Sequence, residues 1–81
     1  EQISTSEFRF SARLEIDYLN EKYSLNLPVS DQYETLAGMI LYYNQSIPKT
    51  GDELMVKPFK IVIKEATNTR IEEIRIEILE S

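Results

Sequence analysis

The side chains available for chemistry in this 81-residue chain are carboxylates, hydroxyls and amines, because the sequence contains no cysteine and no histidine. The lack of cysteine excludes thiolate metal sites and thiol redox chemistry, and the lack of histidine removes the commonest general base. Ser46 with Lys49 is a conceivable nucleophile pair, but its spacing fits a turn equally well. Glycine occurs only at positions 38 and 51, so neither a Walker loop nor a GxGxxG motif can form. We therefore predict no catalytic residues and no enzyme activity.

Two adjacent acidic pairs, Asp52-Glu53 and Glu72-Glu73, could bind a divalent ion weakly. Arg70 and Arg75 flank the second pair, so solvated surface charge is the interpretation that we favour. The sequence has no Asp-x-Asp-x-Asp-Gly run for calcium. We predict no metal site, and a direct sensor of divalent metal stays open as a lesser alternative.

The five tyrosines could form a recognition surface. All are predicted to lie on two helices: Tyr18, Tyr23, Tyr33, Tyr42 and Tyr43. We expect the rings of Tyr23 and Tyr33 in the core, with their hydroxyls in water. Tyr42 and Tyr43, together with Met39, lie off the main apolar stripe and are candidates for contact with a partner.

The charge balance narrows the possible partners. Nine basic against fourteen acidic residues give a net charge of −5 and a pI near 4.6. Such a surface repels phosphate backbones, so we predict no nucleic-acid binding. No apolar stretch approaches the roughly 20 residues that span a bilayer, and EQISTSEF does not resemble a signal peptide. The chain starts at Glu1 rather than at methionine, which suggests a fragment cut from a larger protein.

The elements that must position these side chains begin with a strand. Residues 1–6 are polar and are predicted to be a linker or frayed terminus, which leaves 7–79 as one domain. Phe8, Phe10 and Ala12 alternate with polar residues, as in a half-buried strand. A short amphipathic helix follows from Ile16, through Leu19 and Tyr23, and should end near Ser24 because Leu27 precedes a proline.

The second predicted helix has the clearest pattern. Asp31 is its expected N-cap, and Glu34 its capping-box partner. Its apolar stripe is predicted to face a sheet and consists of Tyr33, Leu36, Ala37, Ile40 and Leu41. Ala37-Gly38 leaves a shallow spot in this stripe where a neighbouring backbone could approach closely.

Three strands are predicted in the second half. Residues 44–52 form turns, with a positive φ at Gly51. The first strand includes Leu54 and Val56, the second Phe59, Ile61 and Ile63, and the third Ile74, Ile76 and Ile78. Asn68 is expected to be left-handed in the last turn, and a bulge near Glu72-Glu73 would return Ile71 to the core.

The predicted fold class is therefore α+β, with an antiparallel sheet of about four strands, two helices on one face and the order β-α-α-β-β-β. The last strand is long and regular, and we expect it at a sheet edge, where it could form a homodimer.

Four sequence runs, the first of which contains two short blocks, together resemble one known family. RLEIDYLNEKYSLNLP, YETLAGMIL, IPKTGDEL and RIEEIRI occur in the order typical of the CorC/HlyC transporter-associated domain, over roughly residues 8–78. The family pattern contains I-D-x-L-N-E, L-x-L-P, Y-x-T-L-A-G, I-P-x-x-G-D and R-I-x-x-V-R-I. Asn44-Gln45-Ser46 replaces a helix end that is more apolar and ends in glycine in the family.

The resemblance implies a non-catalytic, C-terminal accessory or regulatory domain of a magnesium and cobalt efflux or hemolysin-C-like protein. Its expected partners are a pair of CBS domains and the membrane domain of the same parent chain, at the cytosolic face of the membrane. The family fold is similar to one found in FAD-binding oxidoreductases, so a module for FAD or an adenine nucleotide is the alternative. That alternative rests on fold analogy alone, no flavin contact can be assigned to a residue, and no cofactor is predicted.

Overall fold

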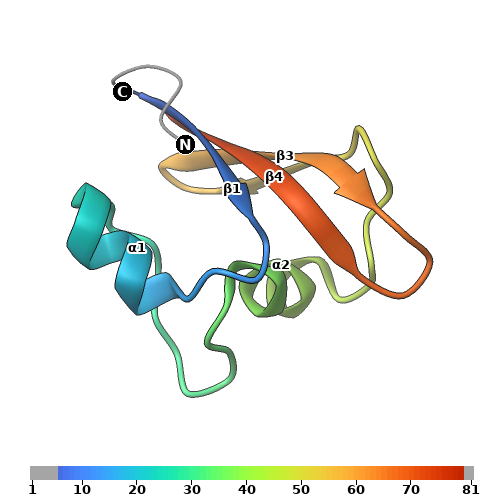
Figure 1. Ribbon diagram of the computed structural model, residues 1–81, viewed down its shortest axis with the longest axis horizontal. Helices are drawn as coiled ribbons and strands as arrows, with labels where there is room; N and C mark the ends of the chain where they lie inside the picture. Colours follow the sequence, from blue (N-terminus) through green and yellow to red (C-terminus); the bar gives the residue numbers. More distant parts are fainter. Residues whose placement is uncertain (1–5, 80–81) are drawn as a thin grey trace.

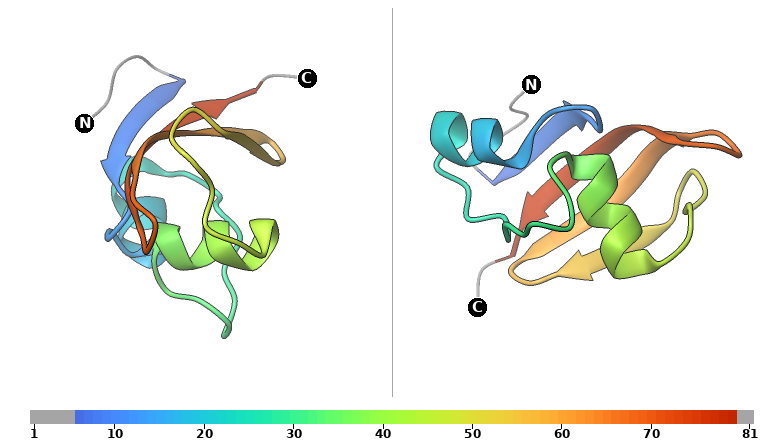
Figure 2. Two further views of the ribbon diagram at one scale, coloured as in Figure 1. Left: turned by 90° about the vertical axis from the view of Figure 1, so that its right-hand side faces the viewer. Right: turned by 90° about the horizontal axis from the view of Figure 1, so that it is seen from below.

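The computed structural model describes residues 6–79, in which four strands and two helices form two layers. The strands are β1 (Glu7–Ser11), β2 (Glu53–Val56), β3 (Phe59–Ala66) and β4 (Ile71–Ile78), and the helices are α1 (Ile16–Tyr23) and α2 (Leu36–Asn44). All neighbouring strands are antiparallel, and both helices lie on the same side of the sheet (Figures 1 and 2). The predicted fold class and element order are confirmed.

The strand order in the sheet is β1-β4-β3-β2, so β4 is a central strand. The prediction that the last strand lies at an edge is therefore wrong, because β4 pairs with β1 on one side and β3 on the other. The free edges of the sheet belong to β1 and β2. This removes the basis for a homodimer through an exposed edge of the last strand.

The alternation of apolar residues places the core between the sheet and the helices. Phe8, Phe10, Ile61, Ile74 and Ile76 are all buried. Across the layer they meet the apolar residues of the helices and of the loop between them: Ile16, Leu19, Leu25, Leu27, Tyr33, Leu36, Met39 and Ile40. The two ring pairs Phe8–Tyr23 and Phe10–Tyr23, with centroids 5.3 and 5.2 Å apart, fix α1 against β1.

The expected bulge in β4 is present and has a counterpart in β3. The register changes from Glu65 opposite Glu73 to Ala66 opposite Ile71, so Glu72 is the extra residue on β4. Between Ile63–Ile74 and Glu65–Glu73 the extra residue is Lys64 on β3. Ile71 is buried as predicted, since the extra residue reverses the face that it occupies.

Helix α1 ends where the sequence indicates, and the loop after it is held by one side chain. Ser24 is left-handed, with φ 55°. The Asn20 amide donates to the Leu27 carbonyl at 3.0 Å, and its oxygen accepts from the Leu27 amide at 2.9 Å. These two bonds replace the strand or helix partners that the backbone of Leu27 lacks. They hold the loop against α1 before the chain continues to α2.

Helix α2 begins later than predicted. Its N-cap is Thr35, whose hydroxyl accepts from the Gly38 amide at 3.1 Å, so the proposed Asp31–Glu34 capping box is wrong. Tyr33 precedes the helix and pairs with Ser30 in an isolated bridge. A methyl group at Gly38 would lie 3.0 Å from the Tyr33 Cβ, which confirms the close approach expected there.

Two turn predictions have opposite outcomes. Gly51 has the predicted positive φ, at 95°, whereas Asn68 is not among the left-handed residues of the described chain. The β3–β4 turn is held instead by Thr67, as described below. The predicted linker, residues 1–6, falls almost entirely outside the described residues, and the domain boundary at residue 7 stays a prediction. The Ser6 carbonyl accepts from the Ile78 amide at 2.8 Å.

Candidate protein-contact surface

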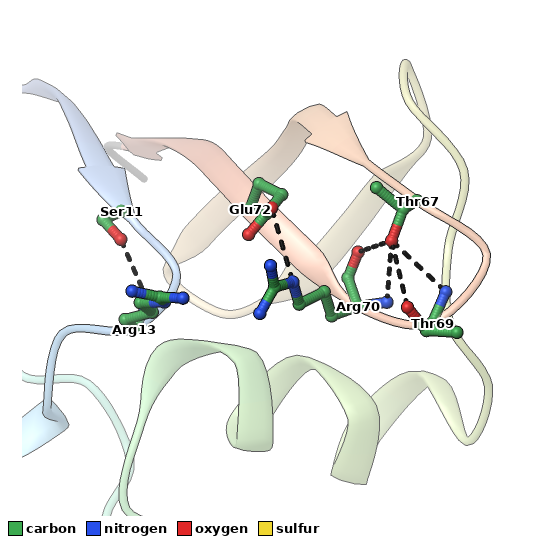
Figure 3. Close-up of polar contacts among 6 residues, drawn as sticks. All are labelled: Ser11, Arg13, Thr67, Thr69, Arg70 and Glu72. Carbon is green, nitrogen blue, oxygen red and sulfur yellow. Dashed lines mark hydrogen bonds and ion pairs between the residues drawn. The ribbon is translucent and has the colours of Figure 1, made fainter.

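The acidic pairs considered as metal ligands are held by basic residues or by turns. Glu72 forms an ion pair with Arg70 at 3.4 Å, and Glu73 pairs with Arg9. Arg75, the other predicted neighbour, has no such contact with either. Arg70 lies at the end of the β3–β4 turn, where its amide donates to the Thr67 hydroxyl at 3.2 Å (Figure 3). Glu72 and Glu73 therefore each form an ion pair with an arginine, and one of these arginines, Arg70, also belongs to the β3–β4 turn.

The other acidic pair and the serine–lysine pair have similar structural partners. The Asp52 carboxylate accepts from the Lys49 amide at 2.8 Å, and Glu53 pairs with Lys60 at 3.4 Å. Ser46 accepts from the Asn44 side chain. No hydrogen bond joins Ser46 and Lys49 anywhere in residues 6–79. Within that same range, no group of three or more acidic residues could hold a metal ion.

Exposed aromatic rings gather at the C-terminal end of α2. Tyr42 and Tyr43 are 49% and 44% exposed, and their ring centroids are 5.2 Å apart. Both contact the buried ring of Tyr33, at 5.4 and 6.4 Å. We call these three residues the tyrosine patch. Met39 does not belong to it, because its side chain is fully buried, and this part of the prediction is wrong.

The remaining tyrosines occupy α1 and the core. Tyr18 is exposed and Tyr23 is half-buried against β1, as expected. The Tyr33 hydroxyl is not in water but donates to the Pro28 carbonyl at 2.8 Å. Leu41, predicted to be in the core, is 38% exposed next to the patch. Its exposure follows from the later helix start, since Met39 takes the buried position instead.

An acidic groove borders the patch and shares Tyr33 with it. Its volume is about 720 Å³, and it lies between the start of α1 and the loop before α2. Four carboxylates line it, together with Tyr33 and a few other residues: Glu15, Asp17, Asp31 and Glu34. The groove could not be predicted from the sequence, because its carboxylates come from two segments that meet only through the path of the loop.

Burial and neighbouring hydroxyls change the acidity of the patch. Burial is the largest influence that raises the pKa of Tyr33 to about 12, followed by hydrogen bonding to Tyr43 and the charges of Tyr43 and Tyr42. On α1, the side chain of Tyr18 is the main cause that raises the pKa of Lys22. Tyr33 is therefore neutral at physiological pH, and the raised pKa of Lys22 favours its charged form beside Tyr18.

No helix in the described residues is long and apolar enough to cross a membrane. Comparison with curated proteins gives no match.

Several solved structures have the same fold as this chain. One is a putative Mg2+ and Co2+ transporter (CorC) associated region from Neisseria meningitidis, with 18% identity, a TM-score of 0.87 and coverage of 98% of this chain and 96% of that one. A transporter associated domain from a Porphyromonas gingivalis CBS domain protein has 23% identity, a TM-score of 0.83 and coverages of 99% and 97%. A Xylella fastidiosa hemolysin domain in complex with Mg++ and Mn++ has 25% identity, a TM-score of 0.79 and coverages of 99% and 96%.

The family comparison agrees with the five sequence blocks and with the fold. Residues 1–80 match the profile of the transporter associated domain, CorC_HlyC. The match includes α1, α2 and all four strands, and thus every element that forms the tyrosine patch. The chain belongs to the CorC_HlyC transporter associated domain family.

Proposed function

We propose that this chain is a non-catalytic accessory domain of a membrane ion-transport or hemolysin-like protein and acts by protein contact at the cytosolic face of the membrane. The tyrosine patch is the observation that favours contact. Tyr42 and Tyr43 expose large rings that are already oriented by the buried Tyr33, so little conformational entropy is lost when a partner covers them. Aromatic residues of this kind are enriched at protein interfaces.

The proposed partner is the CBS-domain pair of the same parent chain, with the membrane domain nearby. A relative from a CBS domain protein supports this choice. The acidic groove beside the patch would favour basic residues on the partner, because its four carboxylates give that side of the domain a negative potential. Neither the patch nor the groove requires a cofactor for this role.

The test is an NMR titration of the isotope-labelled chain with the purified CBS-domain pair of its parent. We expect shift changes centred on Tyr42 and Tyr43, and a Kd raised about tenfold or more by Tyr42→Ser with Tyr43→Ser. Tyr18→Ser is the matched control, since Tyr18 is also 44% exposed but lies on α1, and it should leave the Kd unchanged. Shift changes confined to other surfaces, or none at all, would contradict the proposal.

Direct binding of divalent metal is a second candidate function, favoured by the Xylella relative solved with Mg++ and Mn++. In this chain the acidic pairs are engaged by Arg9, Arg70 and Lys60. A cation would have to displace these basic partners before it could bind, so a metal site is the weaker of the two candidates.

A further inference from the structure

The sheet face opposite the helices presents charged side chains in register across all four strands. One row consists of Arg9, Arg75, Val62 and Glu53, which are paired in that order from β1 to β2. The next row consists of Glu7, Glu77, Lys60 and Met55. Because directly paired residues point to the same side of a sheet, the two rows form one continuous surface.

The centre of this face contains an arginine with one unsatisfied nitrogen. The Arg75 Nε is buried and has no hydrogen-bond partner. The residue directly opposite it on β1 is Arg9, a like charge that pairs with Glu73 instead. A buried charged donor without an acceptor is unfavourable and rare, so this one requires an explanation.

A carboxylate two residues along the same strand is also unused. Glu77 lies on the same face as Arg75 and forms no ion pair with any residue of the described chain, while Lys60 beside it pairs with Glu53 at 3.4 Å. The central strand therefore presents one unpaired positive and one unpaired negative group. They are separated by Ile76, whose side chain is buried on the other face.

We infer that this face is the contact surface of a symmetric dimer of the chain. In this dimer the two sheets face each other, and the two-fold axis lies between them. The axis crosses β4 at a right angle, at the level of Ile76. Each strand therefore faces the same strand of the partner subunit, running in the opposite direction. The axis sets Arg75 against Glu77 of the partner subunit and Arg9 against Glu7 of the partner subunit, and the reverse pairs follow by symmetry. The arginine row thus meets the glutamate row, and the accessible part of the Arg75 guanidinium gains a carboxylate opposite it.

The rest of the rows tolerate the same arrangement. Val62 faces the aliphatic stem of Lys60 of the partner subunit, whose charge is already neutralised by a glutamate. The strands of two packed sheets cross at about 30°, so facing residues stay opposite each other near the centre and separate toward the edges. β4 is central in this sheet, which places the decisive pairs at the middle of the interface.

The size of the face predicts a weak dimer. Four strands about 4.8 Å apart and five residues long give a face roughly 19 by 17 Å. Two such faces cover about 650 Å² in total, well below the roughly 1,200 Å² of stable specific complexes. Since the contacts are largely ionic, we expect association to depend on both concentration and salt.

Sedimentation velocity over a concentration series tests the inference. We expect the 81-residue chain to dimerise at low salt and to dissociate at about 0.5 M salt. Arg75→Glu and Glu77→Arg should each weaken self-association by about tenfold or more, since each places like charges together. Lys22→Glu, on the helix layer, is the matched control for charge and should dimerise as the wild type does.

Charge exchange distinguishes this interface from any other. Mixing the Arg75→Glu and Glu77→Arg chains should produce a heterodimer, because one then supplies two glutamates and the other two arginines. The double variant Arg75→Glu/Glu77→Arg should regain self-association. A misfolded chain would recover in neither experiment, so these results separate loss of contact from loss of folding.

Two results would overturn the inference. One is a wild-type chain that stays monomeric at every concentration at low salt. The other is a dimer that the single charge variants leave unchanged, which would point to pairing through the edges at β1 or β2. The face lies on the opposite side of the sheet from the helix layer that contains the tyrosine patch, so this outcome is independent of the proposed contact with CBS domains.

Discussion

Tyr33 shows how a single side chain can belong to the core and to the contact surface together. Its ring is buried, its hydroxyl donates to the Pro28 carbonyl, and its other face contacts the exposed rings of Tyr42 and Tyr43. The close approach of its Cβ to Gly38 leaves it little freedom to move. Changes at Tyr33 should therefore affect stability and the orientation of the patch together.

The raised pKa of Tyr33 predicts a loss of stability at high pH. The folded pKa of about 12 lies above the unfolded value near 10, so the contribution is fully present below pH 10 and is lost as the pH rises toward 12. Tyr33→Phe should cost about 1 kcal/mol near neutral pH, since the Pro28 carbonyl loses its donor. As the pH rises from the unfolded pKa of Tyr33 to its folded pKa, the free energy of unfolding of Tyr33→Phe should fall less than that of the wild type. Urea unfolding at several pH values measures both effects.

The control for this experiment is Tyr18→Phe, at an exposed tyrosine of α1. Its free energy of unfolding near neutral pH should match that of the wild type. If Tyr33→Phe has the same alkaline slope as the wild type, the buried hydroxyl is not the group that titrates.

Residue identity alone predicts some local conformations and misses others for a definite reason. The positive φ of Gly51 is predicted because this conformation costs glycine nothing. The end of α1 near Ser24 is predicted because a proline follows shortly after it, but the left-handed φ of Ser24 itself is not predicted. Gln45 has φ 63°, and neither its residue type nor its neighbours indicate this. Its conformation follows from the hydrogen bond of its amide to the Leu41 carbonyl at 2.7 Å. Such contacts close only after the helix has formed.

At the scale of elements, the start of α2 was the main misprediction. Tyr33 is apolar and three residues before Leu36, so its spacing matches the helical stripe. The structure buries it through the Ser30–Tyr33 bridge instead, which is a turn that periodicity cannot distinguish from a helix. Once the helix begins at Leu36, Met39 turns inward and Leu41 outward. One shifted boundary therefore changed the predicted core and the predicted surface.

The two possible N-caps make different predictions for stability. Thr35→Ala removes the acceptor for the Gly38 amide and should destabilise the chain by about 1 kcal/mol. Thr35→Ser keeps a hydroxyl acceptor and should lower the free energy of unfolding by only roughly a few tenths of a kcal/mol. Asp31→Ala should have almost no effect, because Asp31 is exposed and lies outside the helix. Thermal unfolding followed by circular dichroism ranks the three variants, and a larger loss for Asp31→Ala would restore the original boundary.

At the scale of the whole molecule, the sequence predicts the strands but not their order. Alternation places Phe8, Ile61 and Ile74 on buried faces, and these are local patterns. The order β1-β4-β3-β2 depends on where β1 joins the sheet, which is a contact between residues more than sixty positions apart. The same long-range pairing brings Arg9 beside Arg75, so the charged face could not be predicted from either strand alone. The absence of cysteine and histidine, by contrast, is evident from composition.

The last prediction concerns small ligands and rests on the charge of the acidic groove. Its four carboxylates repel the phosphates of FAD, ATP and AMP, so none of these compounds should stabilise the chain. A ligand at 100 times its Kd adds about 2.7 kcal/mol, and in a domain of this size each kcal/mol raises the Tm by about 4–8 °C. A melting scan would therefore detect binding easily. Mg²⁺ belongs in the same series, because it should bind only weakly if arginine and lysine occupy the acidic pairs. A shift of several degrees with FAD or a nucleotide would make the domain a ligand sensor, and protein contact would no longer be its primary role.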